Sequence, residues 1–150
     1  MCSRSRDELV NAFASRRIGA YVGVDPTASS MHVGHLIPFM ALFWLYLYGH
    51  KAITLVGGGT ASVGDPTGRV KARPHLSQDS RRRNIEGIEA QLQRIWKNVA
   101  DLGKKHGQGL RHGEAHLLNN EDWLGRTSIL DVLGTVGAGL RLGAMMGRDT

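Results

Sequence analysis

Two short apolar segments separated by an apolar helix constrain the fold more than any other feature of this sequence. Residues 20–24 are mostly apolar and stop at Asp25-Pro26, where proline cannot donate to a strand ladder, so a short strand is expected. Residues 33–48 suit a helix, and residues 52–56 are apolar apart from Thr54, as expected of a central parallel strand. This order predicts a right-handed crossover. The expected fold class is therefore α/β: a partial Rossmann-like nucleotide-binding fold with a parallel sheet flanked by helices.

The helix over residues 33–48 is apolar nearly all round. Pro38 falls in its first turns, where proline is tolerated, and Gly49 supplies a C-terminal stop. A helix without a polar face is expected to be heavily buried. Its aromatic residues are accordingly predicted to be core residues: Phe39, Phe43, Trp44, Tyr46 and Tyr48.

The ends of the two strands predict the position of a binding site. Ligands of such sheets bind outside the carboxyl ends of the strands. Those ends are the Asp25–Thr27 turn and a glycine-rich loop, Gly57–Thr60. We expect the turn and the loop to lie side by side and to form one site.

Two histidines begin the helix that follows the turn. His32 and His35 are three residues apart and so project from one side of its first turn, and Gly34 lets a ligand approach the backbone. Unpaired N–H groups and the positive end of the helix dipole favour an anion there. The pair by itself is also compatible with a structural role. A metal site needs further ligands at suitable spacing, and no such set is apparent nearby.

The glycine-rich segment excludes two common phosphate motifs. Gly59 and Gly64 have the spacing of a P-loop, but Asp65 stands where that motif needs a lysine. The spacing also fails the dinucleotide fingerprint. What remains from the residues alone is a glycine-rich loop with an Asp65-Pro66 turn.

The remaining elements follow from periodicity and caps. Residues 4–17 suit a short helix. Ser77 is a plausible N-cap for a long helix to about Leu102, ended by Gly103. The apolar residues of that helix recur at helical spacing and predict a face packed on the sheet: Ile85, Ile88, Leu92, Ile95, Trp96, Val99 and Leu102. Residues 115–119 suit a strand, and Ser128 with Asp131 a helix start.

Composition fits one folded domain or part of one. The chain has 150 residues, a net charge of +6 and one cysteine, which excludes an internal disulfide framework. The longest apolar run, residues 36–48, is shorter than the roughly 20 residues of a membrane span, so no membrane contact is expected. The arginines and serines near the N-terminus are typical of a mitochondrial presequence, but Asp7 and Glu8 argue against one.

Three segments together resemble a known family. Residues 21–35 read Tyr-x-Gly-x-Asp-Pro-Thr-Ala-x-Ser-x-His-x-Gly-His, and residues 56–69 read Val-Gly-Gly-x-Thr-x-x-x-Gly-Asp-Pro-Thr-Gly-Arg. Residues 119–124 add Asn-Asn-x-x-Trp-Leu. The first string contains the His-box signature of class I aminoacyl-tRNA synthetases, and all three resemble the tyrosyl-tRNA synthetases. The leucine- and methionine-rich tail looks like the fungal mitochondrial branch.

The resemblance implies an activity and a set of site residues. The family joins tyrosine to tRNA-Tyr through tyrosyl-adenylate, with ATP as a substrate that brings Mg²⁺ and with no protein-ligated metal. Matching positions imply these catalytic residues: Thr27, His32, His35, Arg69 and Arg73. They imply contacts with tyrosine from Tyr21, Asp65, Asn119 and Asn120. They imply contacts with ATP from Gly23, Asp25, Thr27, His32, Gly34 and His35.

The resemblance covers residues 21–150 but only the first part of the family's length. We expect residues 1–19 to be an N-terminal helical segment and residues 20–150 the first part of the catalytic domain, a fragment inactive alone without the second half and the tRNA-binding domain. The family implies a homodimer for the full-length protein and favours the mitochondrial matrix over the cytoplasm. Two alternatives stay open: a non-catalytic RNA-binding relative of the group I intron splicing type, and another class I nucleotidyl transferase.

Overall fold

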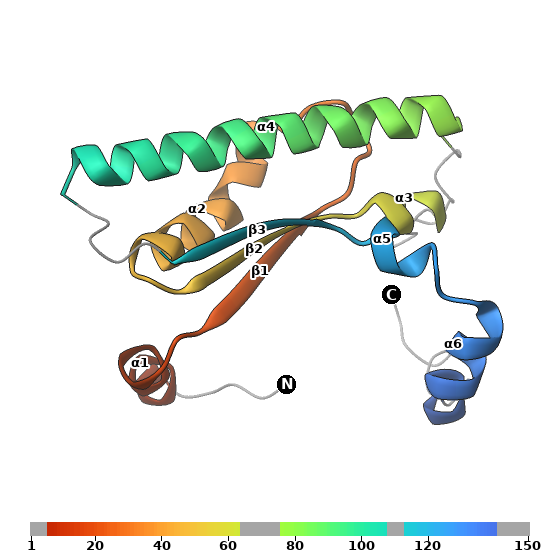
Figure 1. Ribbon diagram of the computed structural model, residues 1–150, viewed down its shortest axis with the longest axis horizontal. Helices are drawn as coiled ribbons and strands as arrows, with labels where there is room; N and C mark the ends of the chain where they lie inside the picture. The colour runs from red at the N-terminus through yellow and green to blue at the C-terminus, as the bar shows by residue number, and fades with distance from the viewer. Residues whose placement is uncertain (1–5, 64–75, 108–112, 141–150) are drawn as a thin grey trace.

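The computed structural model describes residues 6–63, 76–107 and 113–140 as one parallel sheet with helices around it (Figure 1). In chain order the elements are α1 (Arg6–Ser15), β1 (Gly19–Val24), α2 (Val33–Leu47), β2 (Lys51–Val56), α3 (Gly58–Val63), α4 (Gln78–Lys105), β3 (Glu114–Asn119), α5 (Glu121–Leu124), α6 (Ile129–Thr135) and the 3₁₀ helix Gly137–Gly139.

The three strands run parallel in the order β1-β2-β3 and finish level with one another. Val24 pairs with Val56, and Val56 pairs with Asn119. The carboxyl ends of all three strands therefore form one edge of the sheet. The chain leaves this edge at three reversals, which follow Val24, Val56 and Asn119. The parallel sheet with α2 between β1 and β2 confirms the predicted fold class.

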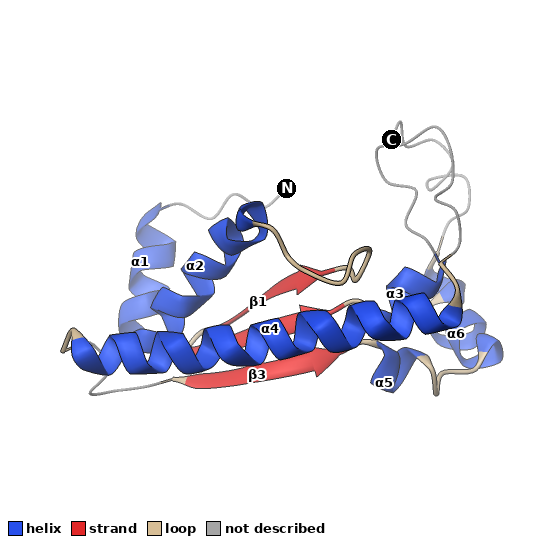
Figure 2. Cartoon of the chain, turned by 90° about the horizontal axis from the view of Figure 1, so that it is seen from above, coloured by secondary structure: helices blue, strands red, loops and turns tan. Residues whose placement is uncertain are grey.

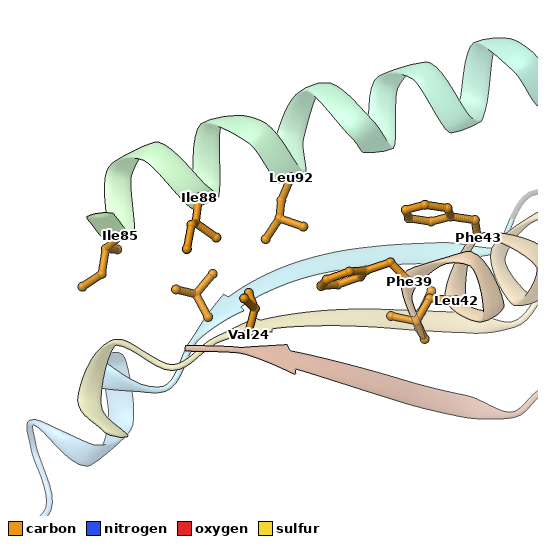
Figure 3. Close-up of a cluster of buried hydrophobic side chains, with 9 residues drawn as sticks. Val24, Phe39, Leu42, Phe43, Ile85, Ile88 and Leu92 are labelled. Atoms are coloured by element: carbon orange, nitrogen blue, oxygen red, sulfur yellow. The ribbon is translucent and has the colours of Figure 1, made fainter. Parts of the chain in front are cut away.

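The hydrophobic core lies between one face of the sheet and the two helices α2 and α4 (Figures 2 and 3). Its buried side chains are Val24, Phe39, Leu42, Phe43, Ala52, Val56, Ile85, Ile88 and Leu92. Each large aliphatic or aromatic side chain among them contributes about 1.5–3 kcal/mol by leaving water. Trp96 extends this core, because its ring meets Phe43 and Tyr46 edge-on and its indole N–H donates to Thr54 Oγ1 at 3.3 Å. Thr54, polar in a buried strand, is satisfied by this bond and by its own donation to the His116 carbonyl oxygen.

The expectation that α2 is heavily buried is wrong for one side of the helix. An apolar stripe faces solvent in the described part of the chain: Val33, Ile37, Met40, Trp44 and Tyr48. Trp44 and Tyr48 are therefore not core residues, whereas Phe39 and Phe43 are. The reason is geometric: the sheet and α4 cover only one side of α2, and an all-apolar sequence cannot indicate which side that is.

The long helix α4 begins where predicted but ends later. The Ser77 hydroxyl accepts from the Ser80 N–H and caps the helix. Gly103 does not stop it; the helix continues to Lys105, and Gly107, with φ of 66°, adopts the left-handed conformation that ends it. Leu102 is 54% exposed, so it does not belong to the core.

The first turn of the glycine-rich segment is helical, which corrects the prediction of a loop over Gly57–Thr60. The Ala61 N–H donates to the Gly57 carbonyl oxygen at 2.9 Å, and α3 continues to Val63. The helix predicted over residues 4–17 is described from Arg6 and ends at Ser15, two residues earlier than predicted, and none of its described residues is buried. Across the described ranges no helix is both long and apolar enough to span a membrane.

Candidate functional site

The predicted site is the edge where the strands end, and its first two reversals lie side by side as expected. The Gly57 N–H donates to the Val24 carbonyl oxygen at 2.9 Å, and the Thr60 hydroxyl donates to Asp25 Oδ1 at 3.0 Å. Glycine at position 57 allows this contact, because a Cβ there would overlap the Asp25 carboxylate and the Thr60 hydroxyl and force them to move. The turn after β1 and the start of α3 therefore form one continuous surface.

The third reversal is joined to the other two by Asn120. Its Oδ1 accepts from the Gly59 N–H at 2.7 Å, and its Nδ2 donates to Thr60 Oγ1 at 3.3 Å. Asn120 is 7% exposed, so both ends of its amide are largely held away from solvent. A chain of hydrogen bonds thus runs from Asn120 through Thr60 to Asp25 and links the ends of all three strands.

Asn119 also forms bonds within the protein. Its Oδ1 accepts from the Glu121 N–H at 3.0 Å and its Nδ2 donates to Glu89 Oε1 at 3.2 Å. For both asparagines, then, the role visible in this structure is to fix the backbone at the edge; their contact with a ligand stays a prediction.

The two histidines form a reciprocal cap at the start of α2. His32 Nδ1 accepts from the Gly34 N–H at 3.1 Å, and His35 Nδ1 accepts from the His32 N–H at 3.2 Å. Their ring centroids are 3.9 Å apart. Because Nδ1 is an acceptor in both rings, each neutral ring carries its hydrogen on Nε2, which donates to no described residue. Two such donors at a helix N-terminus are suited to bind an anion.

Gly34 has a use that its predicted role did not include. The His32 ring lies over it, with Cε1 only 2.9 Å from where a Cβ would stand. A side chain at this position would displace the ring from its cap. Gly34 therefore keeps the imidazole of His32 in place, whatever it also allows a ligand to do.

Tyr21 and Gly23 occupy the face of the sheet that α2 and α4 leave uncovered. Tyr21 is 71% exposed, and its register partner Ile53 lies beside it on the same face. Val22 and Val24 point to the opposite, covered face. A phenol at this position is accessible to a ligand that approaches the open face near the edge.

The structure assigns no place to three of the predicted site residues. Asp65, Arg69 and Arg73 lie outside the described residues. Whether the Asp65 carboxylate lies near the two imidazoles therefore stays a prediction. Thr27 is described: it is exposed, and its N–H donates to the Asp25 carbonyl oxygen at 2.8 Å in a tight turn. Asp25 lies at the edge, and Thr27, His32 and His35 follow it on the short segment that leads to α2.

Sequence reasoning missed the contribution of α4 to this segment. Asn84 Nδ2 donates to the Pro26 carbonyl oxygen at 3.1 Å, and Gln91 Oε1 accepts from the Met31 N–H at 2.9 Å. The sequence did contain a signal for these contacts. Asn84 and Gln91 each stand next to a buried apolar residue of α4, so they lie at the border of its buried face and not on its solvent side.

A separate charged cluster lies at the opposite, amino end of the sheet. The Glu114 carboxylate is 2.9 Å from Arg17 Nη1, 3.4 Å from His116 Nε2 and 4.0 Å from Lys51 Nζ. The hydrogen bond with His116, followed by the charge of Arg17, lowers the pKa of the Glu114 carboxyl. Among the described residues no three metal-binding side chains gather to hold an ion.

Comparisons with known proteins agree on one family. The family described as "tRNA synthetases class I (W and Y)" matches residues 14–150. The chain is 37% identical over 147 residues to the mitochondrial tyrosine–tRNA ligase of Podospora anserina, covering 97% of this chain and 23% of that protein. It is 38% identical over 146 residues to the tyrosine–tRNA ligase of Staphylococcus haemolyticus, covering 97% of this chain and 31% of that protein.

Solved structures give the same result for the fold. A C-terminally truncated mitochondrial tyrosyl-tRNA synthetase of Aspergillus nidulans superposes with a TM-score of 0.89 at 42% identity, over 97% of this chain and 41% of that one. The corresponding protein of Coccidioides posadasii gives 0.81 at 41% identity, over 97% and 38%. The chain therefore spans less than half the length of these relatives.

Proposed function

The chain belongs to the class I tRNA synthetases of the tryptophanyl and tyrosyl group, and we propose that it serves tyrosine–tRNA ligation. The reaction activates tyrosine with ATP to give tyrosyl-adenylate and pyrophosphate, then transfers the tyrosyl group to tRNA-Tyr. The observation that carries the proposal is the reciprocal His32–His35 cap at the N-terminus of α2. The relatives named above are tyrosine enzymes, which supports tyrosine over tryptophan.

The histidine cap supports a role in binding the phosphates of ATP. Activation of an amino acid needs positioning and stabilisation of the charge that develops on the phosphates. The two Nε2–H groups, the N-terminus of α2 and the exposed Thr27 hydroxyl are donors on one segment. In this proposal Thr27 and His32 bind the leaving phosphates, His35 and Gly34 face the nucleotide, and Arg69 and Arg73 clasp pyrophosphate. Mg²⁺ enters with ATP.

Tyrosine recognition is assigned to groups around the same edge. The exposed hydroxyl of Tyr21 meets the phenol of the substrate, and the Asp65 carboxylate binds its ammonium group. A site that hydrogen-bonds a substrate hydroxyl can reject phenylalanine by about 10⁴–10⁵-fold, because its polar group would otherwise be buried unpaired. Asn119 and Asn120 line this region while they hold the strand ends.

The organisation of the protein follows from the same proposal. Residues 20–150 form the first part of the catalytic domain, preceded by a helical segment over residues 1–19. Dimerisation of the full-length protein and a mitochondrial location are proposed from the relatives, which include mitochondrial proteins and a bacterial one.

A hybrid enzyme tests the function. This chain replaces the segment that it matches in the Aspergillus nidulans synthetase, and ATP–pyrophosphate exchange is measured with tyrosine, tryptophan or phenylalanine. We expect exchange with tyrosine alone, and a loss of about 100-fold or more when both His32 and His35 are changed to alanine. The chain by itself should show no exchange. Exchange with tryptophan, or full tyrosine activity in the double variant, would contradict the proposal.

A further inference from the structure

Helix α4 contacts the backbone of the segment between β1 and α2 at three points. Asn84 Nδ2 donates to the Pro26 carbonyl oxygen, and Gln91 Oε1 accepts from the Met31 N–H. Between them, Gly87 lies so close to Ser29 that a Cβ on Gly87 would overlap the Ser29 carbonyl oxygen. All three contacts are made to main-chain atoms, so they fix the path of the segment whatever side chains it carries.

The three residues form a single face of α4. Positions 84, 87 and 91 are separated by three and four residues, the spacing of helical neighbours. The adjacent face of the helix carries Ile88 and Leu92, which are buried against the sheet side of the core (Figure 3). The helix is therefore anchored to the sheet by apolar packing and does not depend on the turn for its own position. It acts as a fixed support from which the turn is held.

The backbone of the turn makes few hydrogen bonds of its own. Over residues 25–31 the described chain contains one internal backbone hydrogen bond, from the Thr27 N–H to the Asp25 carbonyl oxygen. A pocket of about 420 Å³ opens beside this contact; its lining includes Met31, His32, Gln91 and Arg94. The Met31 side chain packs against the core, whereas its backbone N–H is held by the hydrogen bond to Gln91.

Met31 immediately precedes His32, whose backbone and ring form the cap of α2. Any shift of the Met31 backbone is therefore transmitted to the imidazole of His32 and to the first N–H groups of α2. We propose that Asn84, Gly87 and Gln91 are positioning residues that hold the His32 imidazole and the N-terminus of α2 in place for the phosphates of ATP. This inference rests on the proposed function, and none of the three residues needs to touch substrate.

The test uses substitutions that remove the hydrogen-bond acceptor at position 91 and the donor at position 84 one at a time. Gln91→Glu keeps an oxygen that accepts from the Met31 N–H, whereas Gln91→Leu does not. Asn84→Asp removes the donor to the Pro26 carbonyl oxygen and places two oxygens against each other. Gly87→Ala forces the Ser29 backbone away. Gln93→Leu is the matched control, because Gln93 is exposed on the same helix and makes no hydrogen bond within the described residues.

The first readout is hydrogen exchange at the Met31 amide in the full 150-residue chain. It does not depend on enzyme activity. We expect exchange at least tenfold faster in Gln91→Leu, with unchanged exchange in Gln91→Glu, in Gln93→Leu and at core amides such as that of Leu92. Equal exchange at Met31 in the wild type and Gln91→Leu would overturn the inference.

The second readout is kcat per active site in the hybrid enzyme described above. Active-site titration removes any effect of misfolded molecules. We expect Gln91→Leu, Asn84→Asp and Gly87→Ala each to lower kcat for pyrophosphate exchange by about 10- to 100-fold, with the KM for tyrosine unchanged. Fewer active sites with normal kcat would mean a structural role only and would refute positioning. A wild-type hybrid without exchange would instead count against the proposed function, and the Met31 amide would still decide the inference.

Discussion

The bonds of Asn120 predict how much the strand edge depends on a single side chain. In Asn120→Leu the Gly59 N–H loses its acceptor at 2.7 Å, and the Thr60 hydroxyl loses a donor at 3.3 Å. An unpaired, partly buried N–H costs about 1–3 kcal/mol, and the second, neutral bond about 0.5–1.5 kcal/mol. The expected loss of unfolding free energy is therefore about 2–4 kcal/mol, a large fraction of the roughly 5–15 kcal/mol that stabilises a domain.

Asn120→Asp should be milder. Its carboxylate still accepts from the Gly59 N–H, and only the weaker bond to Thr60 Oγ1 is lost, so we expect a loss of about 1 kcal/mol. Asn98→Leu, on the exposed side of α4, is the control and should change the unfolding free energy by less than about 0.5 kcal/mol.

Urea denaturation followed by circular dichroism measures these differences, provided that the slope with denaturant stays constant. Asn120→Leu within 0.5 kcal/mol of the wild type would refute the reasoning, because the hydrogen-bonded chain across the three strand ends would then contribute nothing.

Further outcomes follow from other contacts. Gly57→Ala should destabilise the chain by about 2 kcal/mol or more through overlap with the neighbouring carboxylate, whereas Gly19→Ala, with open space around it, should not; thermal melting compares the two. Trp96→Phe removes the indole donor to Thr54 and should cost about 1–2 kcal/mol in urea unfolding. Glu114→Gln should lower stability at neutral pH. Since the folded-state pKa of that carboxyl is lowered, its contribution is present above the unfolded pKa and is lost as pH falls through the folded pKa, so melting curves of variant and wild type should converge in acid.

The sequence was informative wherever a pattern lies within one segment. The strands were predicted from short apolar runs, the Ser77 cap from its position before a periodic helix, and the meeting of the Asp25 turn with Gly57 from the rule for parallel sheets. These inferences needed only local periodicity and one topological rule.

Side-chain bonds between distant segments could not be predicted in the same way. Asn120 reaches Gly59, and Gln91 reaches Met31, across about 60 positions of chain, and no periodicity marks such pairs. The exposed stripe on α2 was missed for a related reason. Its residues are as apolar as Phe39 on the buried side, so composition carries no information about which side is covered.

The level ends of the three strands limit how the chain length can vary. In a parallel sheet each residue advances the backbone by about 3.3 Å and turns the next side chain to the other face. Deleting one residue inside β2 would therefore withdraw Gly57 from its neighbours and bring Ile53 and Leu55 into the places of buried residues. Single-residue deletions inside β2 should consequently be tolerated less well than deletions in the exposed part of α1, and a library of such deletions would compare the two.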